Sequence, residues 1–196
     1  MRKVLIGFLA MGLCVLGLGA MWIVRADDAD DDDTLKFTAK IDGFQEVGAL
    51  NNETGAILTE GKGTLELSLD RLAKTISFEL TYSGLSAPVT QAHIHFGRVH
   101  TPGGIMVFFC SNLTTPPPPA GTQNCPASGG TVTGIFSAGN VVGPAAQNVT
   151  AGDFDALTDA LFSNSAYANV HTQKFGAGEI RGQIHLPDRR RDEDDK

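Results

Sequence analysis

Residues 64–82 read TLELSLDRLAKTISFELTY, two runs of alternating apolar and polar residues on either side of a turn. The apolar positions are Leu65, Leu67, Leu69, Ile76, Phe78, Leu80 and Tyr82. Because successive side chains of a strand point to opposite faces, each run can bury one face and expose the other. The stretch therefore predicts a β-hairpin with its turn at residues 70–74.

The same alternation recurs between residues 34 and 187, a length that suits one domain with its own core. Further strands are expected at residues 35–41, 91–96, 105–110, 131–136, 167–172 and 179–186. Short strands separated by turn residues at this spacing are typical of antiparallel sandwiches and barrels. We predict an all-β fold, an antiparallel Greek-key β-sandwich or barrel of about eight strands.

One segment departs from the strand pattern. Phe154, Leu157, Ala160 and Leu161 recur at helical spacing, and Asp153 can accept hydrogen bonds from the free amides of a first helical turn. We expect one short amphipathic helix here, with its apolar side against the core, across an open end or edge of the sheet.

The first 26 residues have the layout of a secretory signal peptide. Arg2 and Lys3 precede an apolar run at residues 4–24, and the run ends in a Val-x-Ala sequence that fits cleavage before Asp27. The alternative is an uncleaved anchor, because about 20 apolar residues can span a bilayer. We expect a secreted protein, periplasmic or extracellular, that meets a membrane only if the segment is retained.

Both ends of the mature chain are strongly charged. Residues 27–33, an acidic leader, contain six aspartates, and residues 188–196 form a charged tail. We expect both ends to be disordered. Loss of the three basic residues in 1–26 changes the formal net charge from −7 to −10. The phosphate backbone of a nucleic acid would repel such an acidic chain, so we do not expect a nucleic-acid partner. We expect an extracellular protein or surface of unknown identity as the partner.

The two cysteines of the predicted domain, Cys110 and Cys125, predict a disulfide. They bracket a proline-rich loop, and an exported protein enters an oxidising compartment. The alternatives are a metal pair or a reactive thiol, which would be supported by a Cys-x-x-Cys motif or a neighbouring base, and the sequence has neither.

The candidate chemistry lies in the histidines. Alternation in residues 91–96 turns the apolar side chains to the core and turns His93 and His95 to the opposite, outer face, with Cα atoms about 7 Å apart. The same rule applied to residues 167–172 turns His171 outward. If the two strands are neighbours, three imidazoles meet and can share one cation. His100, in the next loop, and His185 are weaker candidates.

Two interpretations of these histidines stay open. If they bind metal, neutral imidazoles favour Cu²⁺ or Zn²⁺, and affinity should fall below about pH 6, where protons compete. Otherwise they only hydrogen-bond to the backbone or to Glu179 and Arg181. These two residues share the outer face of the last strand. They could orient the histidines as a second shell, or they could form an ordinary cross-strand charge pair.

Several ordered motifs carry a family resemblance. They are Phe37-x-Ala39-x-Ile41-x-Gly43-x-Gln45-Glu46-Val47, Thr54-Gly55-Ala56, Gly84-Leu85, Ala92-His93-Ile94-His95-x-Gly97, Tyr167-x-Asn169-Val170-His171-Thr172 and Gly178-Glu179-Ile180-Arg181-Gly182-Gln183-Ile184. In this order they resemble the CHRD domain, a module named after chordin and also found singly in secreted microbial proteins. The resemblance implies a β-sandwich of a secreted protein and supplies no catalytic residue.

Two function classes follow from these observations. The first is a non-catalytic extracellular binding or structural module. The second is a copper or zinc protein, either a metal-binding domain without turnover or a redox-active domain, since His-x-His with a distant third histidine and a late arginine is similar in outline to copper–zinc superoxide dismutase. That enzyme's pattern also needs a bridging histidine and a zinc-binding aspartate, which the sequence does not place. Motifs for hydrolase, P-loop or zincin chemistry are missing from the sequence.

Overall fold

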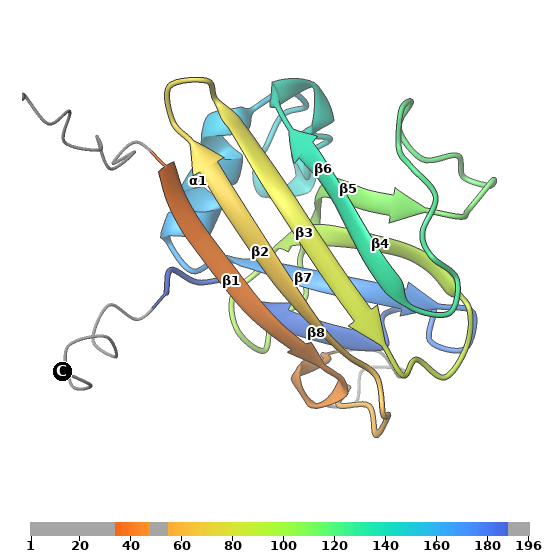
Figure 1. Cartoon of the computed structure of the whole chain (residues 1–196). Coiled ribbons are helices and arrows are strands. Elements are labelled where there is room, and N and C mark those ends of the chain that lie inside the picture. Colours follow the sequence, from red (N-terminus) through yellow and green to blue (C-terminus); the bar gives the residue numbers. More distant parts are fainter. Residues whose placement is uncertain (1–33, 48–54, 188–196) are drawn as a thin grey trace, which may run out of the picture. The chain divides into compact units, whose positions relative to one another are not determined.

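The computed structural model describes residues 34–47 and 55–187, and eight strands form the body of this part of the chain (Figure 1). The strands are β1 (Thr34–Asp42), β2 (Lys62–Asp70), β3 (Thr75–Ser83), β4 (Val89–Phe96), β5 (Gly104–Ser111), β6 (Gly130–Phe136), β7 (Ala166–Thr172) and β8 (Ile180–Gln183). The helices are η1 (Gly43–Gln45), η2 (Ala138–Asn140), η3 (Ala145–Gln147) and α1 (Phe154–Phe162). The predicted signal, leader and tail lie outside the described residues, and within the described part no helix is long and apolar enough to cross a membrane.

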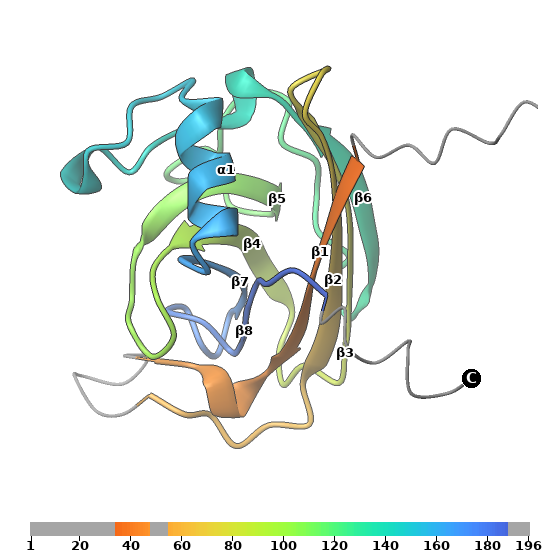
Figure 2. The ribbon, with the colours of Figure 1, turned by 90° about the vertical axis from the view of Figure 1, so that its left-hand side faces the viewer.

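All neighbouring strands pair antiparallel in one sheet of order β5-β4-β7-β8-β1-β2-β3-β6. The sheet curls so that β1, β2, β3 and β6 face β4, β5, β7 and β8 (Figure 2). The predicted fold class is confirmed as a nearly closed, barrel-like sheet of eight antiparallel strands with one α-helix in the described residues. The predicted hairpin is β2–β3, in which Leu67 is the partner of Phe78.

The seam between β8 and β1 is narrow. Arg181 pairs with Asp42, and beyond the end of β8 an isolated bridge joins His185 to Thr38. β8 is therefore shorter than the strand predicted at residues 179–186, because the chain leaves β7 and turns toward β1.

Alternation along the strands produces the core as predicted. Every second residue is buried in β2 from Leu65 and in β3 from Ile76, and the aromatic rings of Phe78 and Phe136 stack at 4.4 Å between centroids. Each fully buried side chain of this size contributes about 1.5–3 kcal/mol relative to exposure.

The predicted helix is α1, at the end of the barrel where β1 begins (Figures 1 and 2). The Asp153 side chain accepts a hydrogen bond from the Ala156 amide at 2.9 Å, which caps the first turn. At the other end, the ring of Phe162 lies edge-on to Phe37 with centroids 5.4 Å apart. The helix thus closes one end of the core, as expected.

The disulfide between Cys110 and Cys125 is confirmed, with their Cα atoms 5.0 Å apart. Asn112 secures the loop that the disulfide closes, because its amide nitrogen donates to the carbonyls of Val89 and Cys125. The irregular loop is thereby fixed to the ends of β4 and β5.

Candidate functional site

Strands β4 and β7 are neighbours, and this pairing brings three histidines together. Asn169 is the partner of His93, so His171, two residues further along β7, lies on the same face of the sheet. Ligand atoms of His93, His95 and His171 all lie within 4.8 Å of one another. His93 Nδ1 and His171 Nε2 are 3.3 Å apart. Two nitrogens on a tetrahedral zinc ion, each about 2.0–2.1 Å from the metal, have about this separation, so one ion could join them once the His93 proton moves from Nδ1 to Nε2.

The histidines are buried, which corrects the expectation of an outer face. His93 exposes 0% of its surface, His95 8% and His171 6%. Alternation gave their direction, away from the apolar core, but residues 97–103 and 173–178 cover that face. The contacts that show this cover are hydrogen bonds from His95 Nδ1 to the Gly103 carbonyl and from His171 Nδ1 to the Gly176 carbonyl, at 2.9 and 3.0 Å.

These hydrogen bonds fix where two imidazoles carry their protons. A carbonyl oxygen can only accept, so Nδ1 of His95 and of His171 must donate, and Nε2 of both rings is unprotonated. The Nε2 lone pair of His95 has no partner, and that of His171 faces His93 Nδ1. Metal-binding histidines usually pass their second N–H to such an acceptor, which holds the ring in position. The backbone of the two covering loops therefore gives both rings the tautomer that a metal ligand needs.

The cluster leaves buried lone pairs without a donor. Because His171 Nε2 accepts, His93 Nδ1 must supply the proton of their contact, and His93 Nε2 is then unprotonated. In the described structure Nε2 of His93 and Nε2 of His95 are both buried and have no hydrogen-bond partner. A buried polar atom left unpaired costs about 1–3 kcal/mol. If the cluster served only as a set of hydrogen bonds, these two unpaired nitrogens would lower the stability of the fold.

Burial keeps the three imidazoles neutral. Burial lowers the pKa of His171 to about 4, and burial with the neighbouring charges of His171 and Arg181 lowers the pKa of His95 to about 4. Burial also lowers the pKa of His93 well below its usual value. The expected loss of metal affinity, placed at about pH 6 for an ordinary histidine, therefore moves to lower pH.

We predict that the metal-free protein loses stability as the pH falls from about 6.5 to about 4. The folded-state pKa values of His95 and His171, about 4, lie below the ordinary 6.5, so in this window protons bind the unfolded chain first. One such histidine lowers the free energy of unfolding by about 3 kcal/mol across the window. Urea unfolding at several pH values with a chelator measures this loss.

A control variant is needed because carboxylates also take up protons toward the acid end of this pH range. It separates their effect on stability from the effect of the clustered histidines. A His171→Gln variant should show a smaller loss, and a His100→Gln, His185→Gln variant should show the full loss. Equal pH dependence in the wild type and in His171→Gln would contradict the assignment.

The hydrogen bonds of Glu179 go to residues other than the histidines. Its carboxylate accepts from the hydroxyls of Thr59, Ser86 and Thr172 and from the Ser86 amide, at 2.7–3.0 Å. Burial raises the pKa of Glu179, but these hydrogen bonds outweigh burial and hold the pKa below its ordinary value. The orienting role, one of the two alternatives for this residue, is filled by the two loop carbonyls.

Arg181 acts on the site through the covering loop and an aromatic ring. It donates to the carbonyls of Arg98 and Thr101, and its guanidinium carbon lies 3.5 Å from the Tyr167 ring centroid. Tyr167 stacks on His95, with ring centroids 4.9 Å apart and planes 3° from parallel. Arg181 is therefore paired with the backbone and an aromatic ring, and in the described residues it forms no ion pair with Glu179.

His100 lies in the same covering loop but outside the cluster. Its side chain is exposed, and its backbone has a positive φ of 59°. Within the described residues the metal-competent group contains His93, His95 and His171. The loop in which His100 lies contributes the Gly103 carbonyl to the site, and His100 is not part of it.

Residues 37–184, most of the chain, match the CHRD domain. The chain belongs to the CHRD domain family. A search of curated proteins and a search of solved structures each found no match. In this CHRD domain, motifs that are far apart in the sequence meet beside the histidines, and Glu46 and Asn169 are one example.

Sequence reasoning missed a buried polar pair beside the cluster of this CHRD domain. Asn169 donates to Glu46 at 2.6 Å and to the Ile180 carbonyl at 2.9 Å. Alternation along β7 could have found Asn169, since it lies on the face of His171. Glu46 had no local signal, because its partner is 123 residues away. Burial raises the pKa of Glu46, and the Val47 amide, Asn169 and Arg181 oppose that rise.

Gly178 makes room for this pair. A Cβ atom built on Gly178 would lie 2.5 Å from Glu46 Oε2 and 2.7 Å from Asn169 Nδ2. Its φ of 136° is also one that other residues rarely adopt. The glycine of the Gly-Glu-Ile-Arg motif is therefore required by the close approach of Glu46.

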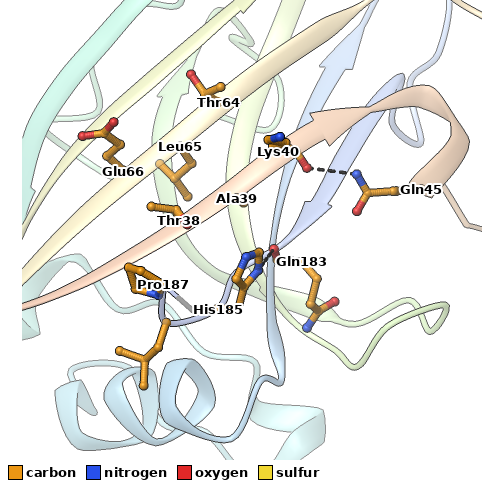
Figure 3. A pocket seen from close by; sticks show the side chains of 11 residues that line it. Thr38, Ala39, Lys40, Gln45, Thr64, Leu65, Glu66, Gln183, His185 and Pro187 are labelled. Carbon is orange, nitrogen blue, oxygen red and sulfur yellow. Dashed lines mark hydrogen bonds between the residues drawn. The ribbon is translucent and has the colours of Figure 1, made fainter. Parts of the chain in front are cut away.

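A groove of about 830 Å³ lies on another part of the CHRD domain, beside β1, β2 and the end of β8 (Figure 3). Its lining includes Lys40, Gln45, Glu66 and His185 but none of the three clustered histidines. His185 Nδ1 lies 3.2 Å from the Gln183 carbonyl. The groove is more spacious than the cluster, but its polar groups are spread over an open surface. We place the candidate site at the cluster, where donor atoms converge.

Proposed function

We propose that this CHRD domain binds a transition metal, copper or zinc, through His93, His95 and His171. One observation carries the proposal: three buried imidazoles face one another, two of them with Nδ1–H held by backbone carbonyls and Nε2 unprotonated. Imidazole nitrogens suit copper and zinc, and hard cations such as Mg²⁺ prefer oxygen ligands. The proposed role is metal binding without turnover.

The proposal explains the cluster better than hydrogen bonding does. A histidine kept only for the fold would be expected to pair both ring nitrogens when it is buried. Here Nε2 of His93 and Nε2 of His95 have no partner in the described structure. The described cluster holds three histidines and no aspartate, so the bridging histidine and zinc-binding aspartate of a dismutase-like site are not among its residues.

Metal analysis of the full chain tests the proposal. The protein, incubated with Zn²⁺ or Cu²⁺ and then freed of excess ion, should retain one equivalent of metal at pH 7. Excess Ca²⁺ should not reduce this amount, because Ca²⁺ competes for carboxylates such as those of residues 27–33 and not for imidazoles. A protein that retains no metal, or loses all of it to Ca²⁺, would refute the proposal.

We predict that His93→Leu weakens metal binding and changes the stability of the metal-free protein little. The substitution removes the unpaired Nε2 lone pair of His93 and places an apolar side chain beside the Phe108 ring, 4.4 Å from the present imidazole, but it also removes the donor of His171 Nε2. These effects oppose each other, so the free energy of unfolding should change by less than about 1 kcal/mol. Urea unfolding in chelator measures it. A large loss of stability would instead indicate that His93 serves the fold.

We further propose that the domain works outside the cytoplasm. Three features support this: membership of the CHRD family, the disulfide, and the signal-like sequence of residues 1–26. Intact-mass measurement of the exported protein tests it, with a mature chain that starts at Asp27 as the expected result. A membrane-bound chain that retains residues 1–26 would be the opposite result.

A partner-binding role is the second candidate, and one observation favours it. Phe44 and Leu58 expose 69% and 88% of their surfaces. They flank the hydrogen bond from the Ile57 amide to the Gly43 carbonyl, so the two apolar side chains belong to one surface region. Cross-linking in the host medium tests it, since a Phe44→Ser, Leu58→Ser variant should lose any specific adduct and keep its metal affinity. An adduct that persists in the variant would exclude this surface.

A further inference from the structure

We infer that the three-histidine site selects monovalent copper, Cu⁺, over the divalent ions Cu²⁺ and Zn²⁺. This inference rests on the proposed function and adds the oxidation state of the metal. Its first basis is the donor set. Within the described residues the cluster offers three imidazoles and no carboxylate or thiolate, so its ligands bring no negative charge. A bound ion therefore keeps its whole charge.

Burial makes that charge costly. The energy of moving an ion from water into a low-dielectric interior grows with the square of its charge, so a divalent ion is penalised about four times as much as a monovalent one. His93 is fully buried, and His95 and His171 expose 8% and 6%. Zinc sites with three protein ligands usually keep a water or hydroxide in an open fourth position. The covering loops leave these imidazoles little access to such a solvent ligand.

The charges of Arg181 and Glu46, beside the cluster, do not compensate for the second charge of a divalent ion. The Arg181 guanidinium lies against the Tyr167 ring, and Tyr167 stacks on His95. One aromatic ring therefore separates a permanent positive charge from the cluster. The buried carboxylate of Glu46 is hydrogen-bonded to Asn169 and is electrostatically coupled to Arg181. These two charges offset each other, and the charge of the metal itself stays unbalanced.

The geometry also suits the coordination of Cu⁺. This d¹⁰ ion is stable with three nitrogen ligands and needs no fourth. The backbone carbonyls of Gly103 and Gly176 already hold two imidazoles with Nε2 unprotonated and turned toward the cluster. Three preorganised neutral donors in a dry site therefore match Cu⁺ in charge and in ligand number.

Competition measurements on the full chain test the inference. A Cys14→Ser background removes a thiol that would itself bind Cu⁺, and ascorbate keeps copper reduced without cleaving the disulfide. Affinity for Cu⁺ is measured against a chromogenic Cu⁺ chelator, and affinities for Cu²⁺ and Zn²⁺ against matched chelators. Ag⁺, an air-stable monovalent d¹⁰ ion, is a second probe. The His95→Gln, His171→Gln variant in the same background subtracts binding outside the cluster.

The affinity of the cluster for Cu⁺ should exceed its affinity for Cu²⁺ by about 100-fold, measured as the part of the binding that depends on the histidines. This ratio raises the reduction potential of bound copper by about 120 mV above that of aqueous copper. Ag⁺ should displace Zn²⁺ from the cluster. Histidine-dependent binding of Zn²⁺ or Cu²⁺ that equals or exceeds that of Cu⁺ would overturn the inference and leave the proposed function intact. If no ion binds in a histidine-dependent way, the proposed function itself fails.

Discussion

Replacement of His95 and His171 by glutamine should lower the affinity for Cu²⁺ and Zn²⁺ by about four orders of magnitude. Structural zinc sites with four ligands bind with about 10–16 kcal/mol, so each ligand accounts for about 3 kcal/mol, or about 100-fold in affinity. Glutamine can still donate a hydrogen bond toward the carbonyls of Gly103 and Gly176 but has no lone-pair nitrogen to offer. Chelator competition or calorimetry at pH 7 measures the change.

The matched control replaces histidines that lie outside the cluster. His100 and His185 are both exposed, and a His100→Gln, His185→Gln variant should bind metal as the wild type does. Circular dichroism and unfolding midpoints establish that both variants are folded. Loss of affinity in the control, or wild-type affinity in the cluster variant, would place the metal elsewhere.

The second large effect is expected for Gly178→Ala, which should lower the free energy of unfolding by about 4 kcal/mol. The added methyl group would meet Glu46 Oε2 and Asn169 Nδ2 at 2.5 and 2.7 Å, and the residue would keep an unfavourable φ of 136°. Backbone strain of this kind costs about 1–3 kcal/mol, and separation of a buried hydrogen-bonded pair costs about as much again. Urea unfolding measures the sum.

Gly152 provides the matched control for backbone strain alone. It has a positive φ of 88°, but a Cβ atom built on it meets no atom within 4 Å. Gly152→Ala should therefore cost only about 1 kcal/mol. Equal losses in the two variants would show that the contact with Glu46 and Asn169 is not what requires glycine at position 178.

Local pattern was sufficient to predict the strands, the helix and the direction of the histidines. Alternation depends only on the two-residue period of a strand, so it correctly turned His93 and His95 away from Ile94 and the core. The helix could be predicted for the same kind of reason, because the cap at Asp153 and the spacing of its apolar residues are both local. The disulfide followed from cysteine number and compartment.

Exposure of the histidine face could not be predicted in this way. Whether a strand face meets solvent or protein depends on loops that fold back over it. Residues 97–103 and 173–178 have no periodic signal that aims them at the histidines. The hydrogen-bond partners of Glu179 could not be predicted for the same reason, since Thr59 and Ser86 lie 120 and 93 residues away.

By itself, therefore, the sequence determined the family, the antiparallel β fold, the disulfide and the three residues that can meet as metal ligands, because each of these follows from short-range periodicity, composition or ordered motifs. Only the tertiary structure decided that the three imidazoles are buried, neutral and held by the carbonyls of Gly103 and Gly176. It also decided that Glu46 and Asn169 form a pair across 123 residues. The physical reason is that burial and hydrogen-bond partners are set by which distant segments come into contact, and the strand period carries no information about those contacts.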